Sequence, residues 1–192
     1  KKCFETDWLN KIRMDTIRLP EICEDMEVLG MYKDIPVTVA IGDNQASFLG
    51  AAGSENNTLL VNMGTGGQIS VLTDQYFETE GIEARPFLGG KYLLVGASLC
   101  GGKAYALLEN FFRSFMKEAT GQDIPLYEIL GRLAEKGMDA SSSSMKVQTT
   151  FDGTRTDSGL RGEIRNISSD NFTPEFLTYG VLEGMIRELY DM

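Results

Sequence analysis

The apolar positions of this chain fall into short runs that are separated by glycines and other turn-forming residues. Two such runs, at residues 59–61 and 69–72, flank the cluster Gly64-Thr65-Gly66-Gly67. Short apolar runs on either side of a glycine cluster predict the two strands of a tight hairpin. Residues 91–95 predict a further, buried strand.

A longer segment, residues 99–117, carries apolar residues at helical spacing. The spacing predicts a helix with Ser98 as its N-cap and one face turned toward the core. That face comprises Ala104, Leu107, Leu108, Phe111, Phe112 and Phe115.

Two more helices are predicted in the second half of the chain. Residues 125–136 suit an amphipathic helix that Gly137 would end, and the serine run at 141–144 suits a solvated loop. Thr173 and Pro174 predict the cap and first turn of the last helix. Its inward residues would be Phe176, Leu177, Val181, Met185 and Leu189.

A strand and a helix are also predicted on either side of Asp43. Val37, Val39 and Ile41 alternate into a strand, and residues 45–52 suit a short helix rich in small residues. Ligands of open α/β sheets bind at such strand-to-helix turns. Asp is equally a favoured N-cap, so this carboxylate has a structural interpretation as well as a functional one.

The predicted hairpin turn contains more glycine than turning requires. One glycine satisfies a positive φ, whereas three around Thr65 leave N–H groups with no Cβ in the way. Such a turn suits a phosphate chain, with the Thr65 hydroxyl as an extra donor. A flexible hairpin turn is the structural alternative. Arg155 and Arg161 could likewise face phosphates or form salt bridges within their loop.

The motifs GDNQASFLGA and LLVNMGTGGQIS, in this order and spacing, resemble those of the FGGY carbohydrate kinases, members of the actin-like ATPase superfamily. Residues 85–112 resemble the strand, glycine turn and long helix that follow the hairpin in these kinases. Within the family, the sequence of this segment is most similar to the sedoheptulokinase branch. Residues 149–189 resemble the family's "G-E/T-R … R-G" loop and the helix after it. The resemblance therefore covers nearly the whole chain.

The resemblance implies an α/β fold, an actin-like ATPase (ribonuclease H-like) domain with a mixed sheet and flanking helices, incomplete in this chain. Residues 1–35 would form a lead-in helix and linker, and residues 36–192 part of the second, C-terminal kinase domain. The family's N-terminal domain, which holds most of the Mg²⁺ and sugar contacts, would be absent. We therefore expect a fragment that cannot phosphorylate sugar alone.

The resemblance also implies roles for individual residues. Asp43 would be the general base that takes the proton from the sugar hydroxyl, and Asn44 would hydrogen-bond the sugar. Contacts to the transferred phosphoryl group and the nucleotide would come from Gly64, Thr65, Gly66, Gly96 and Cys100. Most members of the family carry other residues where Cys100 stands. No metal ligand is implied within this chain.

The implied reaction uses ATP, with Mg²⁺, to phosphorylate a sugar, with a ketose such as sedoheptulose as the expected acceptor. Glycerol, xylulose, ribulose and gluconate kinases share the quoted motifs. A non-catalytic actin-like module that binds nucleotide or serves as a scaffold is the alternative. A dinucleotide enzyme fits poorly, because Ile69 occupies the third glycine position of G-x-G-x-x-G and a strand follows.

The amino-acid composition excludes or disfavours several classes of function. The net charge of −10 and the pI near 4.6 argue against a nucleic-acid surface, which needs concentrated Lys and Arg. The chain contains no histidine, which excludes His-based triads and His-ligated metal sites. No apolar run approaches the roughly 20 residues that cross a bilayer.

Three cysteines without a C-x-x-C pair fit reduced thiols in a cytoplasmic protein, with a disulfide between Cys3 and Cys23 as the alternative. The last predicted helix ends at the chain terminus without neighbours in the sequence. We therefore expect exposed apolar surface there, and homo-oligomer formation or crystal pairing through it.

Overall fold

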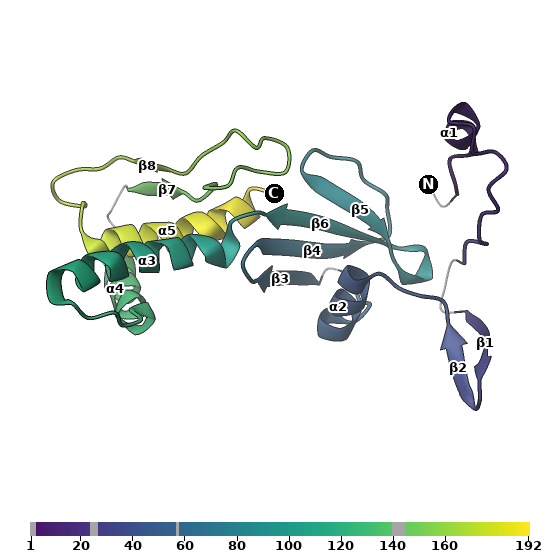
Figure 1. Ribbon diagram of the computed structural model, residues 1–192, viewed down its shortest axis with the longest axis horizontal. Coiled ribbons are helices and arrows are strands. Elements are labelled where there is room, and N and C mark those ends of the chain that lie inside the picture. Colours follow the sequence, from purple (N-terminus) through teal and green to yellow (C-terminus); the bar gives the residue numbers. More distant parts are fainter. Residues whose placement is uncertain (1–2, 24–26, 57, 140–144) are drawn as a thin grey trace. The chain divides into compact units, whose positions relative to one another are not determined.

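The computed structural model describes residues 3–23, 27–56, 58–139 and 145–192 (Figure 1). The predicted serine loop at 141–144 lies outside these residues. The chain divides into two compact units. The first unit comprises residues 1–58, 71–77 and 84–94, and the second comprises residues 59–70, 78–83 and 95–192.

The elements follow one another along the chain in this order: α1 (Thr6–Lys11), β1 (Val28–Tyr32), β2 (Ile35–Thr38), α2 (Asp43–Ala52), β3 (Leu59–Met63), β4 (Gly67–Thr73), β5 (Ile82–Pro86), η1 (Leu88–Gly90), β6 (Tyr92–Ser98), α3 (Gly101–Thr120), α4 (Tyr127–Asp139), β7 (Lys146–Gln148), β8 (Glu163–Arg165) and α5 (Pro174–Tyr190).

The strand predicted to run into Asp43 is shorter than its apolar alternation suggested. β2 pairs antiparallel with β1 in a two-stranded ribbon whose residues are all exposed. β2 ends at Thr38, which pairs with Val28, so Val39 and Ile41 lie in the segment that leads to α2. A strand extends only as far as its partner, and alternation alone does not reveal where the partner stops.

The predicted hairpin is confirmed by β3 and β4, which are neighbours in a four-stranded sheet of order β3-β4-β6-β5. The buried strand predicted at 91–95 corresponds to β6. Buried and partly exposed residues alternate along β4, where Ser70 and Leu72 are buried. This is the pattern of a strand with one face on a core.

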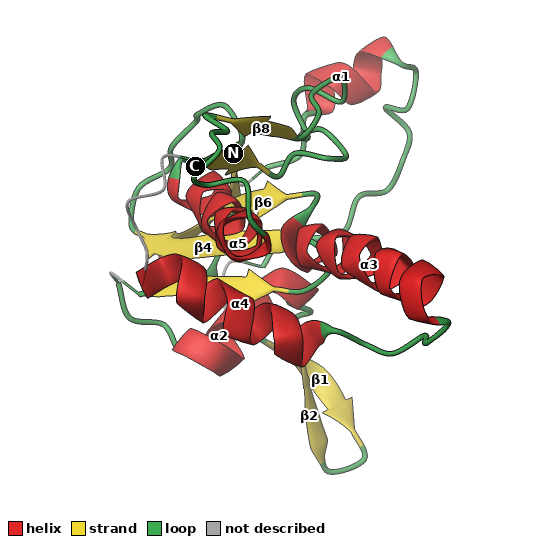
Figure 2. Cartoon of the chain, turned by 90° about the vertical axis from the view of Figure 1, so that its left-hand side faces the viewer, coloured by secondary structure: helices red, strands yellow, loops and turns green. Residues whose placement is uncertain are grey.

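The second unit contains a core between α3, β7 and α5 (Figure 2). The prediction for α5 is confirmed at Val181, Met185 and Leu189, which are buried. Thr173 caps α5, since its hydroxyl accepts from the Phe176 N–H at 3.5 Å, and a proline follows it as predicted. The core cluster comprises Cys100, Ala104, Leu108, Met145, Val147, Val181 and Met185.

The apolar face predicted for α3 is only half correct. Ala104 and Leu108 are buried, and Phe112 packs partly against the core. Leu107, Phe111 and Phe115 form the neighbouring row of the helix and are exposed by 43%, 63% and 73%. The helical spacing identified both rows, whereas the core of the second unit covers only one of them.

Gly137 does not end α4, which continues to Asp139. A Cβ at Gly137 would lie 2.5 Å from the Glu175 carbonyl oxygen and 2.7 Å from the Tyr179 Cβ, both on α5. The glycine therefore permits a close helix–helix contact instead of providing the predicted C-cap, and Figure 2 shows α4 beside α5.

Two expectations from composition concern the cysteines and the membrane. Cys3, Cys23 and Cys100 are all free thiols, so the alternative disulfide between Cys3 and Cys23 is wrong. Within the described part of the chain, no helix combines the length and apolar character that crossing a membrane would need.

Candidate functional site

Asp43 is the first residue of α2 and lies in the first unit. The N-cap is Gly42, so the predicted capping alternative is displaced by one position. The Asn44 N–H donates to Asp43 Oδ1 at 2.7 Å, a contact with the first helical turn. The side chain of Asp43 is nevertheless exposed, and its carboxylate remains open to solvent.

The start of α2 is anchored within the first unit. Gln45 Nε2 donates to the Pro86 carbonyl at 3.3 Å, and the ring of Phe48 packs edge-on against Phe87 with centroids 5.8 Å apart. Among the described residues, Asn44 Oδ1 is a buried acceptor without a hydrogen-bond partner. An unpaired buried acceptor costs free energy, which a donor from a ligand could offset.

The turn Gly64-Thr65-Gly66 lies in the second unit and is seated on the first turn of α3. The Gly102 N–H donates to the Gly64 carbonyl at 2.8 Å, and the Lys103 N–H donates to the Thr65 carbonyl at 3.0 Å. The first N–H groups of a helix lack partners within the helix. The glycine turn therefore caps α3 through its own backbone.

Close packing explains two of the glycines in this region. A Cβ at Gly101 would overlap the backbone of Gly66 and Gly67, and a Cβ at Gly66 would lie 2.7 Å from the Ser98 carbonyl oxygen. Neither residue has a positive φ. Gly66 and Gly101 are thus required because two backbone segments lie in close contact at these positions. The sequence analysis, which interpreted the turn as phosphate-binding, did not predict this role.

The backbone of the turn has fewer free donors than the sequence suggested. The Gly64 N–H donates to the Gly66 carbonyl at 2.9 Å, which closes the turn on itself. Gly64 and Thr65 are still exposed residues, so the outer rim of the turn is accessible.

Cys100 is the N-cap of α3, the place predicted for Ser98. Ser98 instead ends β6, and its hydroxyl accepts from the Cys100 N–H at 3.2 Å. The thiol is fully buried. Burial, and then the negative charge of Asp152, raises the pKa of the Cys100 thiol, which favours its protonated form.

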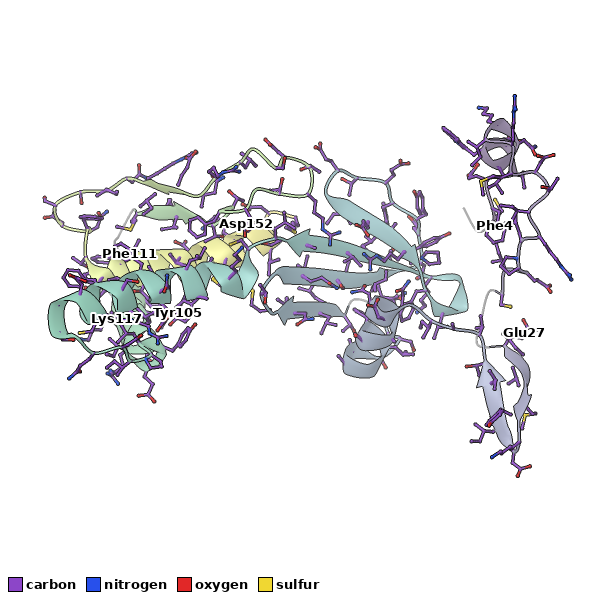
Figure 3. All side chains as sticks on the ribbon, in the orientation of Figure 1. Phe4, Glu27, Tyr105, Phe111, Lys117 and Asp152 are labelled. Carbon is purple, nitrogen blue, oxygen red and sulfur yellow. The ribbon has the colours of Figure 1, made fainter. Side chains whose placement is uncertain are left out.

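An ion pair beside Cys100 was not found by sequence reasoning. Lys103 Nζ lies 2.8 Å from Asp152 Oδ2, and the two side chains are 43% and 41% exposed. The hydrogen bond between them raises the pKa of Lys103 and lowers that of Asp152. Asp152 lies near the N-terminal end of α3 (Figure 3). The sequence signal that could have indicated this ion pair is Lys103, a lysine three residues after the N-cap of α3.

Gly96 is buried within β6. A Cβ there would lie 2.9 Å from the Ile82 Cδ1 and Met192 Sδ atoms and 3.0 Å from the Ile69 Cγ2 atom. Its surroundings are therefore apolar side chains, and its implied role at the nucleotide stays a prediction.

The arginines of the 149–165 segment have partners in the second unit. Arg155 Nη1 lies 2.6 Å from Glu83 Oε1. Arg161 Nη1 donates to the carbonyls of Ser158 and Leu160, at 2.8 and 2.6 Å. Arg155 thus forms a salt bridge, as one of the two predicted alternatives stated. Arg161 instead donates hydrogen bonds within its own loop.

The structure brings together the glycine turn and Cys100 at the start of α3, all within the second unit. Asp43 and Asn44 lie in the first unit. The roles that the resemblance implies for Asp43, Asn44 and Thr65 stay predictions. The described residues include no group of three or more histidine, cysteine, aspartate or glutamate side chains that could hold a metal ion.

No protein-family model and no curated protein sequence matches the chain. Solved structures do match. A ligand-bound xylulose kinase from Lactobacillus acidophilus superposes with a TM-score of 0.76 and 18% identity, over 98% of this chain and 40% of that chain. A gluconate kinase from the same organism gives 0.75 and 19%, over 98% and 39%. A xylulose kinase from Rhodospirillum rubrum gives 0.66 and 22%, over 80% and 30%.

Similarity at these identities shows the fold. The chain has the predicted mixed α/β fold, in the form that these xylulose and gluconate kinases share. It spans between 30% and 40% of the length of the three kinases.

Proposed function

We propose that the protein carrying this chain is an FGGY-type carbohydrate kinase, which transfers the terminal phosphoryl group of ATP to a sugar hydroxyl. The observation that carries the proposal is the turn Gly64-Thr65-Gly66, seated on the first turn of α3 with Thr65 exposed at its rim. The fold that the chain shares with xylulose and gluconate kinases supports it. Residues 36–192 would form part of the second kinase domain.

The proposed chemistry is an in-line transfer. The sugar hydroxyl oxygen bonds to the terminal phosphorus of ATP as the bond from that phosphorus to the bridging oxygen breaks, which releases ADP. Asp43 accepts the proton of the hydroxyl, for which its exposed carboxylate is accessible. Thr65 donates a hydrogen bond to the moving phosphoryl group. Such a transfer needs positioning and charge stabilisation more than covalent help.

The acceptor would bind at the start of α2. The unpaired Asn44 Oδ1 supports a contact with a sugar hydroxyl, because a hydroxyl supplies the donor that this acceptor lacks among the described residues. A ketose such as sedoheptulose is proposed as the acceptor because the sequence of residues 85–112 resembles the sedoheptulokinase branch. The acceptor is tested by the assay described next.

Replacing Asp43 by Asn tests the proposed base. Turnover is expected to fall at least about a hundredfold, the usual contribution of general acid–base catalysis, while sugar affinity changes little. The measurement is coupled ADP release by the complete gene product with ketoses, polyols and gluconate as acceptors. Asp34→Asn is the matched control, since Asp34 is an exposed acid in the turn between β1 and β2.

Turnover that survives in D43N would show that Asp43 is not the base. A protein that binds ATP but turns over none of these acceptors would support the alternative, a non-catalytic actin-like module.

A further inference from the structure

The start of α3 offers a phosphate few backbone donors. The N–H groups of Gly102 and Lys103 already donate to the glycine turn, and the Gly64 N–H is used within the turn. A triphosphate carries several negative charges and binds most tightly to charged donors. A cation beside the turn would therefore strengthen the binding of a triphosphate there.

Lys103 belongs to the helical turn on which the glycine turn is seated. The Lys103 backbone N–H donates to the Thr65 carbonyl at 3.0 Å, and this hydrogen bond fixes the backbone of Lys103 next to Thr65. The arginines of the neighbouring loop are engaged elsewhere, Arg155 with Glu83 and Arg161 with carbonyls of its own loop. Lys103 is therefore a cationic residue whose backbone is held directly beside Thr65.

The present partner of Lys103 can be exchanged. The pair with Asp152 is nearly half exposed on both sides, and exposed ion pairs contribute little to stability. A phosphate oxygen carries the same kind of charge as the Asp152 carboxylate and can take its place. The flexible lysine stem lets the ammonium group move while the backbone stays in position.

We propose that Lys103 contacts the terminal phosphate of the nucleotide at the Gly64-Thr65-Gly66 turn, and that it exchanges Asp152 for this phosphate on binding. The inference rests on the proposed function, because it assumes that the turn holds the group to be transferred. Asp152 then holds Lys103 beside the turn when nucleotide is absent and competes with the phosphate when nucleotide arrives.

The chain contains a matched control on the same helix. Lys117 also pairs with an aspartate, since its Nζ lies 3.0 Å from Asp123 Oδ2 with 60% and 43% exposure. Lys117 lies toward the other end of α3, whereas Asp152 lies near its N-terminal end (Figure 3). The variants K103M and K117M each remove an exposed lysine–aspartate pair, and only the first pair is beside the turn. Asp123 keeps Arg113 as a second partner in K117M.

The test is calorimetric titration of the complete gene product with ATP, ADP and inorganic tripolyphosphate. K103M should bind ATP and tripolyphosphate about tenfold more weakly, as expected for one charge-assisted hydrogen bond, and lose less affinity for ADP. K103R keeps the charge and should bind nearly as wild type, and K117M should be unchanged. Asp152→Asn should bind ATP more tightly than wild type, whereas Asp123→Asn should not.

Equal affinities of K103M and K117M, or an equal loss for ATP and ADP in K103M, would overturn the contact with the terminal phosphate and leave the kinase proposal standing. Weaker ATP binding by D152N would overturn the exchange, because Asp152 would then act as a brace. A complete wild-type protein that binds neither ATP nor tripolyphosphate would overturn this inference and the assignment of the turn together.

Discussion

A glycine near a candidate phosphate site suits two different roles, and the residue type alone does not distinguish them. The sequence suggested bare N–H groups for phosphate, whereas Gly66 and Gly101 are required where two backbones meet. Thr65, between these tight contacts, is exposed. The candidate site therefore combines closely packed backbone segments with an exposed threonine.

Gly101→Ala tests this packing. The added Cβ would overlap the backbone of Gly66 and Gly67, which cannot move aside as a flexible side chain can. We expect a loss of about 1–3 kcal/mol in the free energy of unfolding, typical of overpacking. Urea denaturation measures it, with Gly50→Ala as control, because nothing lies within 4 Å of a Cβ at this helical glycine. Unchanged stability of G101A would contradict the close approach.

At the level of elements, the sequence predicted the β3–β4 hairpin, β6, α2, α3 and α5, because each carries its own periodic signal or cap. The sequence-based predictions were wrong where contact with another helix or strand determines the bounds of an element. β2 stops where β1 stops, and α4 passes through Gly137 because α5 lies against it. The exposed row of α3 is a further case, since periodicity cannot tell which row receives a partner.

The two glycines of α4 should respond to alanine with opposite signs. Gly131→Ala fills open space and should stabilise the protein by about 0.5–1 kcal/mol through helix propensity. Gly137→Ala brings a Cβ to 2.5 Å from the Glu175 carbonyl on α5 and should destabilise it. Thermal unfolding of both variants, monitored by circular dichroism, provides the comparison. Stabilisation by both substitutions would show that α4 and α5 are not in close contact.

At the candidate site, the sequence and the family resemblance supplied Asp43 and the glycine turn, each from a short local motif. They did not supply the Lys103–Asp152 pair, whose members are separated by most of α3, all of α4 and β7. Contacts between distant segments depend on how helices and loops pack. No local spacing encodes them.

For the whole molecule, the acidic composition combines with paired carboxylates to set the response to pH. Hydrogen bonds from Lys117 and Lys103 lower the pKa values of Asp123 and Asp152 below their ordinary value of 3.8. A carboxyl group with a lowered folded pKa stabilises the fold above its unfolded pKa. That stability is lost as the pH falls through the folded value.

We therefore expect the urea midpoint to be level near neutral pH and to fall below about pH 4. Both pairs are exposed, so the effect of each should be small. Urea titrations from pH 6 to pH 3 on the wild type and on Asp123→Asn, which lacks one of these titrating groups, provide the measurement. A midpoint that rises on acidification would contradict the assignment.

The β1–β2 ribbon has a practical consequence. All of its residues are exposed, and Lys33, in the turn between the two strands, has a φ of 55°. Lengthening such a surface loop adds only slowly to its closure entropy. The tip between Lys33 and Asp34 is thus a tolerant position for an inserted epitope or fluorescent reporter, which would leave the residues at positions 43 and 65 unchanged.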